Sequence, residues 1–512
     1  MTKVLGIANI ERFRSIVANR FGLHFEDAKT GFLGDVLRRR LDQTGQPCES
    51  YLELLYAKGS RTELCALARE LTVGETYFFR NIDQFRAFSE AALPNRIQVR
   101  ASQKKLRMLS AGCASGEEAY SLAILLREAA IDPSWDISIL AVDINPAMID
   151  AAVQARFSTW ALRETPPEVQ RHWLRSVSPG TFSLDASLGH NIRFEVRNLV
   201  EDDPELWQPE AYDVIFCRNV IMYFTPEASR GVVAHITRAL APGGYLFLGH
   251  AETLRGLSQD FHLHHTHGTF YYQRREHVNP CLDHPLTVTS LTAAAPRPHF
   301  LTVELGDTWI DTIRKATERI QSLADARPTR SAPDRANLPV SKQLKWDLAL
   351  PLELLEKEHF TAALDFIQAL PPESARDTDV LLLHAVLLAH RGQFTASQDV
   401  CLRLLGIDEL NAGAHYVLAL CHEGLGDSIE AANHNQVAVY LDPGFAMPHL
   451  HLGLIARRRG ERDSAQRELG QALTLLQRED ASRLLLFGGG FSRDALIALC
   501  RAELAACGGS YG

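Results

Sequence analysis

Three acidic residues have the types and the spacing of a ligand-binding site. Glu117 and Glu118 directly follow the small-residue turn AGCASG, and Asp143 stands about 25 residues further on. Small residues let backbone approach a ligand closely, and an acid at about this separation can accept hydrogen bonds from a ribose. The alternative use of Asp143 is to cap a helix that begins at Pro146, and both uses are compatible.

The turn itself discriminates between ligands. It departs from the G-x-G-x-x-G pattern of dinucleotide sites, and two glutamates stand where a helix would begin. A phosphate prefers a helix N-terminus that is free of negative charge. The pair Glu117–Glu118 therefore favours a ligand with positive charge. S-adenosyl-L-methionine, which carries an ammonium and a sulfonium, fits better than NAD.

The elements that must position these acids form a strand, a turn, a helix and a second strand over residues 106–145. Strands and helices continue to alternate up to residue 273, which predicts a parallel sheet with helices on both faces and an antiparallel edge. Residues 176–190 lack helical periodicity, so we expect a small hairpin there, beside the site. The predicted fold class is α/β, with a doubly wound, Rossmann-like sheet.

Helical segments are expected on either side of the sheet. In residues 1–92 apolar side chains recur at helical spacing. Residues 277–343 are dominated by Pro, Thr, Ala and Ser, which is typical of a linker, with one possible helix at 309–324. The predicted organisation is a helical N-terminal domain (1–92), the sheet domain (93–276), the linker (277–343), a repeat domain (344–480) and a C-terminal capping helix (481–512).

The repeat domain is indicated by a period of 34 residues. Gly392, Gly426 and Gly460 share this spacing, and so do the small residues at positions 363, 397, 431 and 465. Helix pairs of this length, with a small residue where the helices cross, are typical of tetratricopeptide repeats, an all-α architecture. The alternative is an ordinary helical bundle in which the register is a coincidence.

Composition narrows the class of protein. The chain has 512 residues, 46% of them hydrophobic, and a net charge of −9; residues 1–100 carry 15 Lys and Arg against 12 Asp and Glu. This balance is too weak to predict nucleic-acid binding. No apolar run suits a signal peptide or membrane span, so we expect a cytoplasmic protein without membrane insertion.

Nine scattered cysteines suggest reduced thiols. Residues 262–267 contain four histidines, whose side chains would point to both faces of a strand. They would therefore not converge on one ion, and we expect no metal site.

Further motifs appear in a fixed order, and together they resemble the CheR family of chemoreceptor glutamate methyltransferases. The ordered set covers about residues 8–275. It comprises a helical front, T-x-F-F-R, S-G-E-E-A-Y-S, D-I-N, N-L, F-C-R-N-V-I-M-Y-F and L-F-L-G-H-A-E. A tetratricopeptide extension and the tail GGGFSRDALIALCRAEL resemble a biofilm-associated, Wsp-type branch of that family.

The resemblance implies a class I methyltransferase domain with S-adenosyl-L-methionine as cofactor, and it assigns site residues. Thr76 and Arg80 would line the site, Glu118 and Asp143 would hold the cofactor, and the remaining positions would flank the adenine or close the pocket: Asn198, Leu199, Arg218, Asn219 and Tyr223. Gly74 belongs to the cofactor-binding set but stands where many members have Asn, so one side-chain contact would be missing.

Two of these side chains suit the implied chemistry. A carboxylate acceptor is already ionised at neutral pH, so methyl transfer needs no general base. Arg80 offers a fork of N–H donors that matches a carboxylate, and Tyr223 could orient the donor methyl. The alternatives are that Arg80 caps a helix and that Tyr223 is a core tyrosine.

The implied partner is a methyl-accepting chemoreceptor-like protein, contacted by the N-terminal domain, with a further protein partner for the repeats. Arg38, Arg39 and Arg40 are a candidate docking face, because methylated receptor helices are acidic; the alternative is a solvated helix face. The region 176–190 lacks the glycine-rich turn of members that tether to a receptor pentapeptide, so we expect no such tether. Rival functions are methyl transfer to another protein or a small molecule, and an inactive cofactor-binding scaffold.

Overall fold

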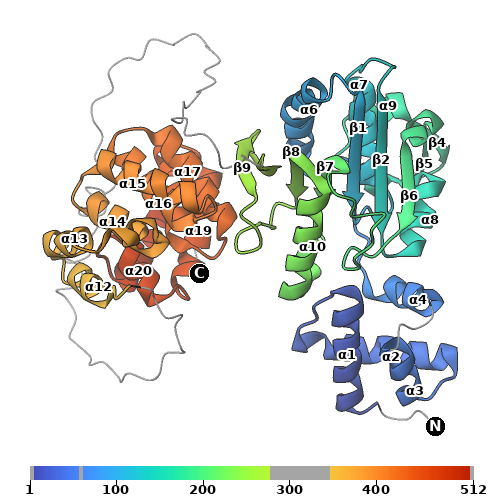
Figure 1. The fold of residues 1–512 in the computed structure, drawn as a ribbon, viewed down its shortest axis with the longest axis horizontal. Helices are drawn as coiled ribbons and strands as arrows, with labels where there is room; N and C mark the ends of the chain where they lie inside the picture. The colour runs from blue at the N-terminus through green and yellow to red at the C-terminus, as the bar shows by residue number, and fades with distance from the viewer. Residues whose placement is uncertain (1–4, 57–60, 277–345, 508–512) are drawn as a thin grey trace. The chain divides into compact units, whose positions relative to one another are not determined.

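The structure is a computed structural model, and it describes residues 5–56, 61–276 and 346–507. The chain divides into two compact units, residues 1–277 and residues 278–512, which Figure 1 draws in blue to green and in yellow to red. The expected linker at 277–343, with its possible helix at 309–324, lies outside the described residues. Among the helices of the described ranges, none combines the length and the apolar composition that a membrane span requires.

Helices open the first unit, as the apolar spacing predicted. A buried set that includes Phe13, Val17 and Leu37 forms the common core of the first four helices, whereas the last two pack into the core of the sheet domain. Gly22, with φ of 71°, ends the first helix, because glycine adopts this left-handed conformation without a steric penalty. The helices are α1 (Ile7–Phe21), α2 (Thr30–Thr44), α3 (Cys48–Tyr56), α4 (Arg61–Leu71), α5 (Ile82–Ala87) and α6 (Leu93–Val99), with the π-helical turn η2 (Phe88–Ala92) between the last two.

A seven-stranded sheet follows, in the order β6-β2-β1-β7-β8-β10-β9 (Figure 1). Pairing is parallel from β6 to β8 and antiparallel for β10 and β9, which confirms the predicted sheet with its antiparallel edge. The strands are β1 (Lys105–Ala111), β2 (Asp136–Asp143), β6 (Ile192–Val196), β7 (Tyr212–Cys217), β8 (Leu240–Leu248), β9 (Phe261–Thr266) and β10 (Thr269–Arg274).

The strand order reverses between β1 and β7. Helices α7 (Glu117–Glu128) and α8 (Pro146–Gln154) precede strands on one side of this point, and α10 (Pro226–Ala239) precedes β8 on the other. The connections therefore diverge beyond the carboxyl ends of β1 and β7 and leave a crevice there, which is where ligands bind in doubly wound sheets.

Aromatic packing fixes the segment before the sheet onto its centre. The rings of Phe216 and Phe247 stack with centroids 4.4 Å apart, and Phe85 of α5 lies 5.8 Å from Phe216. Strand β7 is buried along its whole length, as expected for a strand covered on both faces. This core holds the residues around Arg80 at the sheet's carboxyl edge.

A small antiparallel sheet is inserted before β6. It has the order β3-β5-β4, from β3 (Arg156–Ser158), β4 (Leu174–Ser178) and β5 (Thr181–Leu184). The hairpin of β4 and β5 confirms the prediction for residues 176–190. Between β3 and β4 lie the short turn η3 (Thr159–Leu162) and α9 (Pro167–Trp173), and η4 (Ala186–Asn191) follows β5.

The second unit repeats a pair of helices every 34 residues. Three pairs begin at Thr378, Ala412 and Ala446, and their second helices begin at Phe394, Ser428 and Arg462. The pairs are α14 (Thr378–His390) with α15 (Phe394–Ile407), α16 (Ala412–Gly424) with α17 (Ser428–Leu441), and α18 (Ala446–Arg458) with α19 (Arg462–Leu476); α12 (Ala349–Glu356) with α13 (Phe360–Gln368) precedes them.

The 34-residue positions have a physical basis in this unit. The small residues at 363, 397, 431 and 465 are all fully buried, and Gly392, Gly426 and Gly460 all have positive φ between the helices of a pair. In the first pair, Glu358 takes the equivalent position with φ of 58°, which a non-glycine residue adopts at a cost. The period therefore reflects a recurring turn and helix crossing, as in tetratricopeptide repeats.

The chain continues with α20 (Ala481–Phe487) and α21 (Arg493–Ala506). Helix α21 packs on α19, whereas the short α20 packs on α12 and α14, which belong to the first two helix pairs. Phe487 anchors it, with its ring 5.6 Å from that of Tyr416 and 5.0 Å from that of Phe445. Helix α20 thus lies against the first helices of the repeats.

Candidate functional site

A pocket lies at the carboxyl ends of β1, β2, β6 and β7. Ten of its lining residues are the ten predicted from the sequence: Gly74, Thr76, Arg80, Glu118, Asp143, Asn198, Leu199, Arg218, Asn219 and Tyr223. They come from five separate stretches of the chain. The structure thus brings the whole predicted set together, while the role of each residue stays a prediction.

The turn after β1 brings its backbone close to the pocket through small residues. Gly112 has φ of 80°, and a Cβ there would lie 2.4 Å from Val220 Cγ2, so a larger residue would clash. The Ala114 N–H donates to Asp143 Oδ2 at 2.9 Å, and the Asn145 N–H donates to Oδ1 at 2.8 Å. Burial raises the pKa of Asp143, and these backbone donors oppose that shift.

Asp143 is not the cap of the following helix. The Asn145 side chain accepts from the Ala147 N–H at 3.0 Å and caps α8. The Asp143 carboxylate is therefore free of that role and lies at the pocket wall. Its oxygens accept backbone N–H groups, and a carboxylate has further lone pairs that can accept from a ligand hydroxyl.

Only one of the two adjacent glutamates reaches the pocket, which corrects the expectation for the pair. Glu117 is buried, is absent from the lining, and accepts from Ser115 Oγ at 2.8 Å. Glu118 lines the pocket and accepts from Ser110 Oγ at 2.7 Å. Successive residues of a helix point about 100° apart, so both could not face the same ligand.

Glu118 is already paired within the protein. Arg218 Nη1 lies 3.2 Å from its Oε2, and another Arg218 N–H donates to the Arg80 carbonyl oxygen. Burial raises the pKa of Glu118 and lowers that of Arg218, and each charge opposes the shift of the other. The pair links α7, the end of β7 and the segment around Arg80, so it fixes three walls of the pocket at once.

Arg80 is turned toward the pocket and caps no helix. Its Nη1 donates to the Glu75 carbonyl oxygen at 3.2 Å, while Asn81 occupies the start of α5. The backbone beside it is fixed, because the Phe79 N–H donates to Ser121 Oγ at 3.0 Å and the Phe78 ring packs 4.8 Å from that of Phe157. Within the described part of the chain, Arg80 forms no salt bridge with a carboxylate, although its positive charge opposes the rise in the pKa of Glu118.

Tyr223 is 42% exposed, so it is no core tyrosine. Its carbonyl oxygen accepts from the His24 N–H at 2.8 Å, and the Thr225 N–H donates to the Gly22 carbonyl oxygen at 2.7 Å. The N-terminal segment after α1 is therefore part of the site.

Pocket residues from that N-terminal segment were missed by the sequence reasoning: Phe21, Leu23, His24, Phe25 and Lys29. A Cβ on Gly22 would lie 2.6 Å from Val200 Cγ2, so glycine is needed for this close approach. The glycine that ends an amphipathic helix was the available signal, but nothing local shows what such a glycine packs against.

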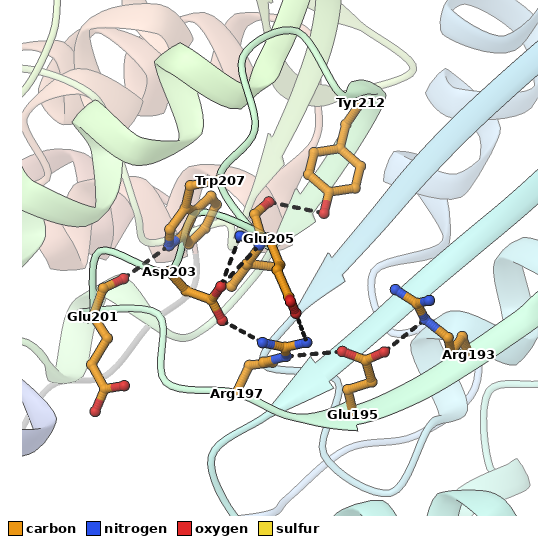
Figure 2. Close-up of polar contacts among 9 residues, drawn as sticks. Arg193, Glu195, Arg197, Glu201, Asp203, Glu205, Trp207 and Tyr212 are labelled. Carbon is orange, nitrogen blue, oxygen red and sulfur yellow. Dashed lines mark hydrogen bonds and ion pairs between the residues drawn. The ribbon is translucent and has the colours of Figure 1, made fainter.

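Arg197 organises the loop that carries Asn198 and Leu199, and Figure 2 shows the contacts of its guanidinium. Its guanidinium contacts Glu195 at 2.9 Å, Asp203 at 2.6 Å and Glu205 at 2.9 Å. Arg197 itself lines the pocket and was not predicted. One side chain thus joins the end of β6 to the far end of the loop.

The structure accounts for two positions at which the sequence differs from many members of the family, Gly74 and the β4–β5 hairpin. A Cβ on Gly74 would lie 2.4 Å from Met148 Sδ, so Met148 occupies the space that an asparagine would need. No residue of the β4–β5 hairpin lines the pocket, which corrects the expectation that this hairpin lies beside the site.

The prediction that Arg38, Arg39 and Arg40 form one docking face is wrong for Arg40. Arg40 is buried, and its Nη2 lies 2.7 Å from Glu63 Oε2. Arg38 and Arg39 stay about half exposed but pair with Asp35 and Glu70 at 2.7 Å. Three consecutive helix residues cannot share one face, and Arg40 is the one that points inward.

Comparison with known proteins gives the same picture for the first unit. The family model described as CheR methyltransferase, SAM binding domain matches residues 74–270. Chemotaxis protein methyltransferase 2 of Vibrio cholerae serotype O1 is 34% identical over 259 residues, which cover 49% of this chain and 88% of that protein.

Similarity to a second relative extends through the repeats. The probable biofilm formation methyltransferase WspC of Pseudomonas putida is 27% identical over 461 residues, covering 90% of this chain and 96% of that protein. A solved tetratricopeptide repeat protein of Thermus thermophilus is 21% identical over 31% of this chain and 96% of its own, with a TM-score of 0.25.

Proposed function

The chain belongs to the CheR methyltransferase family, and we propose that it methylates glutamate side chains of a methyl-accepting chemoreceptor-like signalling protein in a surface-sensing or biofilm pathway. Its cofactor is S-adenosyl-L-methionine, since the matched family model is a SAM-binding domain. The similarity to chemotaxis and biofilm methyltransferases supports the substrate and the pathway.

The pocket fits this cofactor. Asn219 Oδ1 and Arg218 Nε are buried at the pocket without a hydrogen-bond partner, and buried polar groups are usually paired. Asn219 Oδ1 would accept from the amino-acid ammonium, Asp143 from the ribose hydroxyls, and Asn198 and Leu199 would flank the adenine. When bound, the cofactor supplies an electrophilic methyl group.

One observation supports the proposed binding of the acceptor glutamate. The Arg80 guanidinium lines the pocket and, within the described residues, forms no salt bridge with a carboxylate. Arg80 would hold the acceptor carboxylate by two N–H donors and so orient one oxygen for in-line attack. Tyr223 would fix the position of the donor group and exclude water. No proton has to move, because the carboxylate attacks in its ionised form.

The test is methyl transfer to purified receptor signalling domains from tritiated S-adenosyl-L-methionine. We expect base-labile label on the receptor, as a glutamate methyl ester requires. Arg80→Ala should lower kcat/KM on the order of 100-fold, and Arg80→Lys, which keeps the charge but loses the fork, should recover only part of it. The cofactor Kd, measured by calorimetry, should change little in Arg80→Lys. Transfer only to some other acceptor, or cofactor binding without any transfer, would contradict the proposal.

A further inference from the structure

We propose that the outer rim of the pocket is a docking surface for an acidic, amphipathic helix of the substrate protein, the helix that carries the acceptor glutamate. The rim is defined as Val73, Tyr77, Trp160, Arg163 and Met222. This inference rests on the proposed function and names the residues that would select the substrate segment.

The rim exposes apolar side chains that normally pack in a core. Val73 is 72% exposed, Trp160 65% and Met222 54%. Val73 and Tyr77 line the pocket; Met222 does not, but it directly precedes the lining residue Tyr223 in the chain. A cluster of exposed large apolar residues around a pocket mouth is the usual mark of an interaction site, whereas one scattered apolar residue would need no explanation.

An arginine connects the exposed tryptophan to the pocket wall. The Arg163 guanidinium lies 3.5 Å from the Tyr77 ring centroid and 4.2 Å from that of Trp160. Arg80 approaches the same tyrosine at 5.8 Å. The order from the pocket outward is therefore Arg80, Tyr77, Arg163 and Trp160, with cations and rings alternating.

The rim is held rigidly relative to Arg80. The Phe78 N–H, two residues before Arg80, donates to the Ala161 carbonyl oxygen at 3.0 Å. The η3 turn that carries Trp160 is capped by Ser158, whose Oγ accepts from the Ala161 N–H at 3.3 Å. Arg163 Nη1 also donates to the Trp160 carbonyl oxygen at 2.9 Å. A surface ordered before binding loses little entropy when a partner docks.

The charge of the rim suits an acidic partner. Arg80 forms no salt bridge with a carboxylate in the described residues, and Arg163 is only loosely paired, 3.8 Å from a Glu75 side chain that is 66% exposed. An ion pair of this length with an exposed carboxylate contributes little, so a substrate carboxylate can replace Glu75. Glu164 interacts with Tyr77. Because Glu75 and Glu164 would repel acids placed beside them, the surface can bind only a substrate segment whose acidic residues lie next to the arginines.

One helix of the substrate can contact both arginines and an exposed apolar side chain of the rim. Residues three or four apart share a helix face, so the acceptor glutamate can enter toward Arg80 while an acid one turn away meets Arg163 and an apolar residue covers Trp160 or Val73. Tryptophan and arginine are enriched among the residues that dominate binding energy at interfaces, and both are present here.

The test compares Trp160→Ala and Arg163→Gln with Val153→Ala in the full chain. Val153 is 64% exposed on α8 and does not line the pocket, so it is a matched control for truncation of an exposed side chain. We expect the KM for the receptor domain to rise about 10-fold in each rim variant, with kcat and the KM for S-adenosyl-L-methionine unchanged. Raising the salt should increase the receptor KM of the wild type more than that of Arg163→Gln.

The outcomes separate the two proposals. If the wild type methylates a receptor domain and both rim variants keep its receptor KM, the docking surface is wrong and the proposed function stands. An equal rise in the KM for the cofactor would also overturn the inference, since it would indicate a distorted pocket. If the wild type methylates no receptor domain, the proposed function fails and the docking surface fails with it.

Discussion

One buried carboxylate, Glu252, organises the loop between β7 and Tyr223. Its two oxygens accept four backbone N–H groups, from Gly249 at 2.6 Å, Asn219 at 2.7 Å, Val220 at 2.9 Å and Met222 at 3.1 Å. Asn219 has φ of 57°, a conformation that costs energy in a non-glycine residue and persists only where its surroundings impose it. Glu252 lies in the L-F-L-G-H-A-E motif, yet its sequence context gave no sign of this role.

Replacing Glu252 by Gln should therefore loosen the loop without changing its volume. The amide NH₂ would face two backbone N–H donors, so we expect kcat to fall on the order of 10-fold and the free energy of unfolding to fall by about 1–3 kcal/mol. In the double variant Glu252→Gln with Tyr223→Phe, the fold-decrease in kcat should be smaller than the product of the two single fold-decreases, because both substitutions would act on the same loop.

Glu227→Gln is the control, since Glu227 is an exposed acid at the start of α10 that pairs only with Arg230 in the described residues. It should leave kcat and the unfolding midpoint unchanged. Independent, multiplicative effects of Glu252→Gln and Tyr223→Phe would show that Glu252 only supports the fold.

At the scale of elements, the pocket is assembled from segments that the sheet gathers at one edge. Strand β6 ends at Val196, and the loop that follows it depends on Arg197 (Figure 2). The Asp203 carboxylate also accepts from the Glu205 N–H at 2.9 Å, so the loop is closed at both ends. On the opposite side, Asn198 Nδ2 donates to the Arg20 carbonyl oxygen at 2.9 Å, which joins the loop to α1.

We expect Arg197→Met to weaken cofactor binding selectively. Methionine keeps most of the side-chain volume but loses all three ion pairs, so the loop bearing Asn198 and Leu199 should become mobile. The KM for S-adenosyl-L-methionine should rise about 10-fold while kcat at saturation changes less than about 2-fold, because Arg80 and Tyr223 are not on this loop.

Arg193→Met provides the matched control. Arg193 pairs with the same Glu195 at 2.7 Å but is 72% exposed, and exposed ion pairs contribute little. Its steady-state constants should equal those of the wild type. If Arg197→Met instead lowered kcat at saturating cofactor, Arg197 would act on more than the cofactor-binding loop, and the prediction would be wrong.

At the scale of the whole molecule, the repeat unit carries a partly buried pair of histidines between α16 and α17. His415 Nδ1 lies 3.1 Å from His434 Nδ1, and His415 Nε2 donates to the Glu409 carbonyl oxygen at 3.2 Å. Only one ring can donate across the pair, so at most one of the two can be protonated. Burial lowers the pKa of His415 to about 4 and, together with the neighbouring histidines, that of His434 to about 3.

The repeat unit should therefore lose stability on mild acidification. These pKa values lie below the value of about 6.5 in an unfolded chain, so the stabilisation is complete above pH 6.5 and declines as the pH falls toward 4. Scanning calorimetry of the full chain should show a transition that moves to lower temperature between pH 7 and pH 5. His434→Gln should reduce this shift, and His359→Gln, at an exposed position, should not. An equal shift in all three proteins would refute the assignment.

The sequence by itself determined the local elements, their order and the cofactor class. Amphipathic spacing identified the helical front, alternation identified the sheet, and the 34-residue period identified repeats whose turns and crossings recur at Gly392 and Ser397. These features depend on residues close in sequence, and their spacing follows from helix and strand geometry. The ordered motifs then located all ten predicted pocket residues.

Only the tertiary structure decided which side chains point where and what they meet. It turned Glu117 and Arg40 inward, placed the segment after Gly22 at the pocket, and set Glu252 under the loop of Asn219. Each outcome is a contact between residues far apart in the chain, fixed when helices and sheet bury their apolar faces together. A local pattern records that a residue belongs to a helix or a loop, but its partner is chosen by packing.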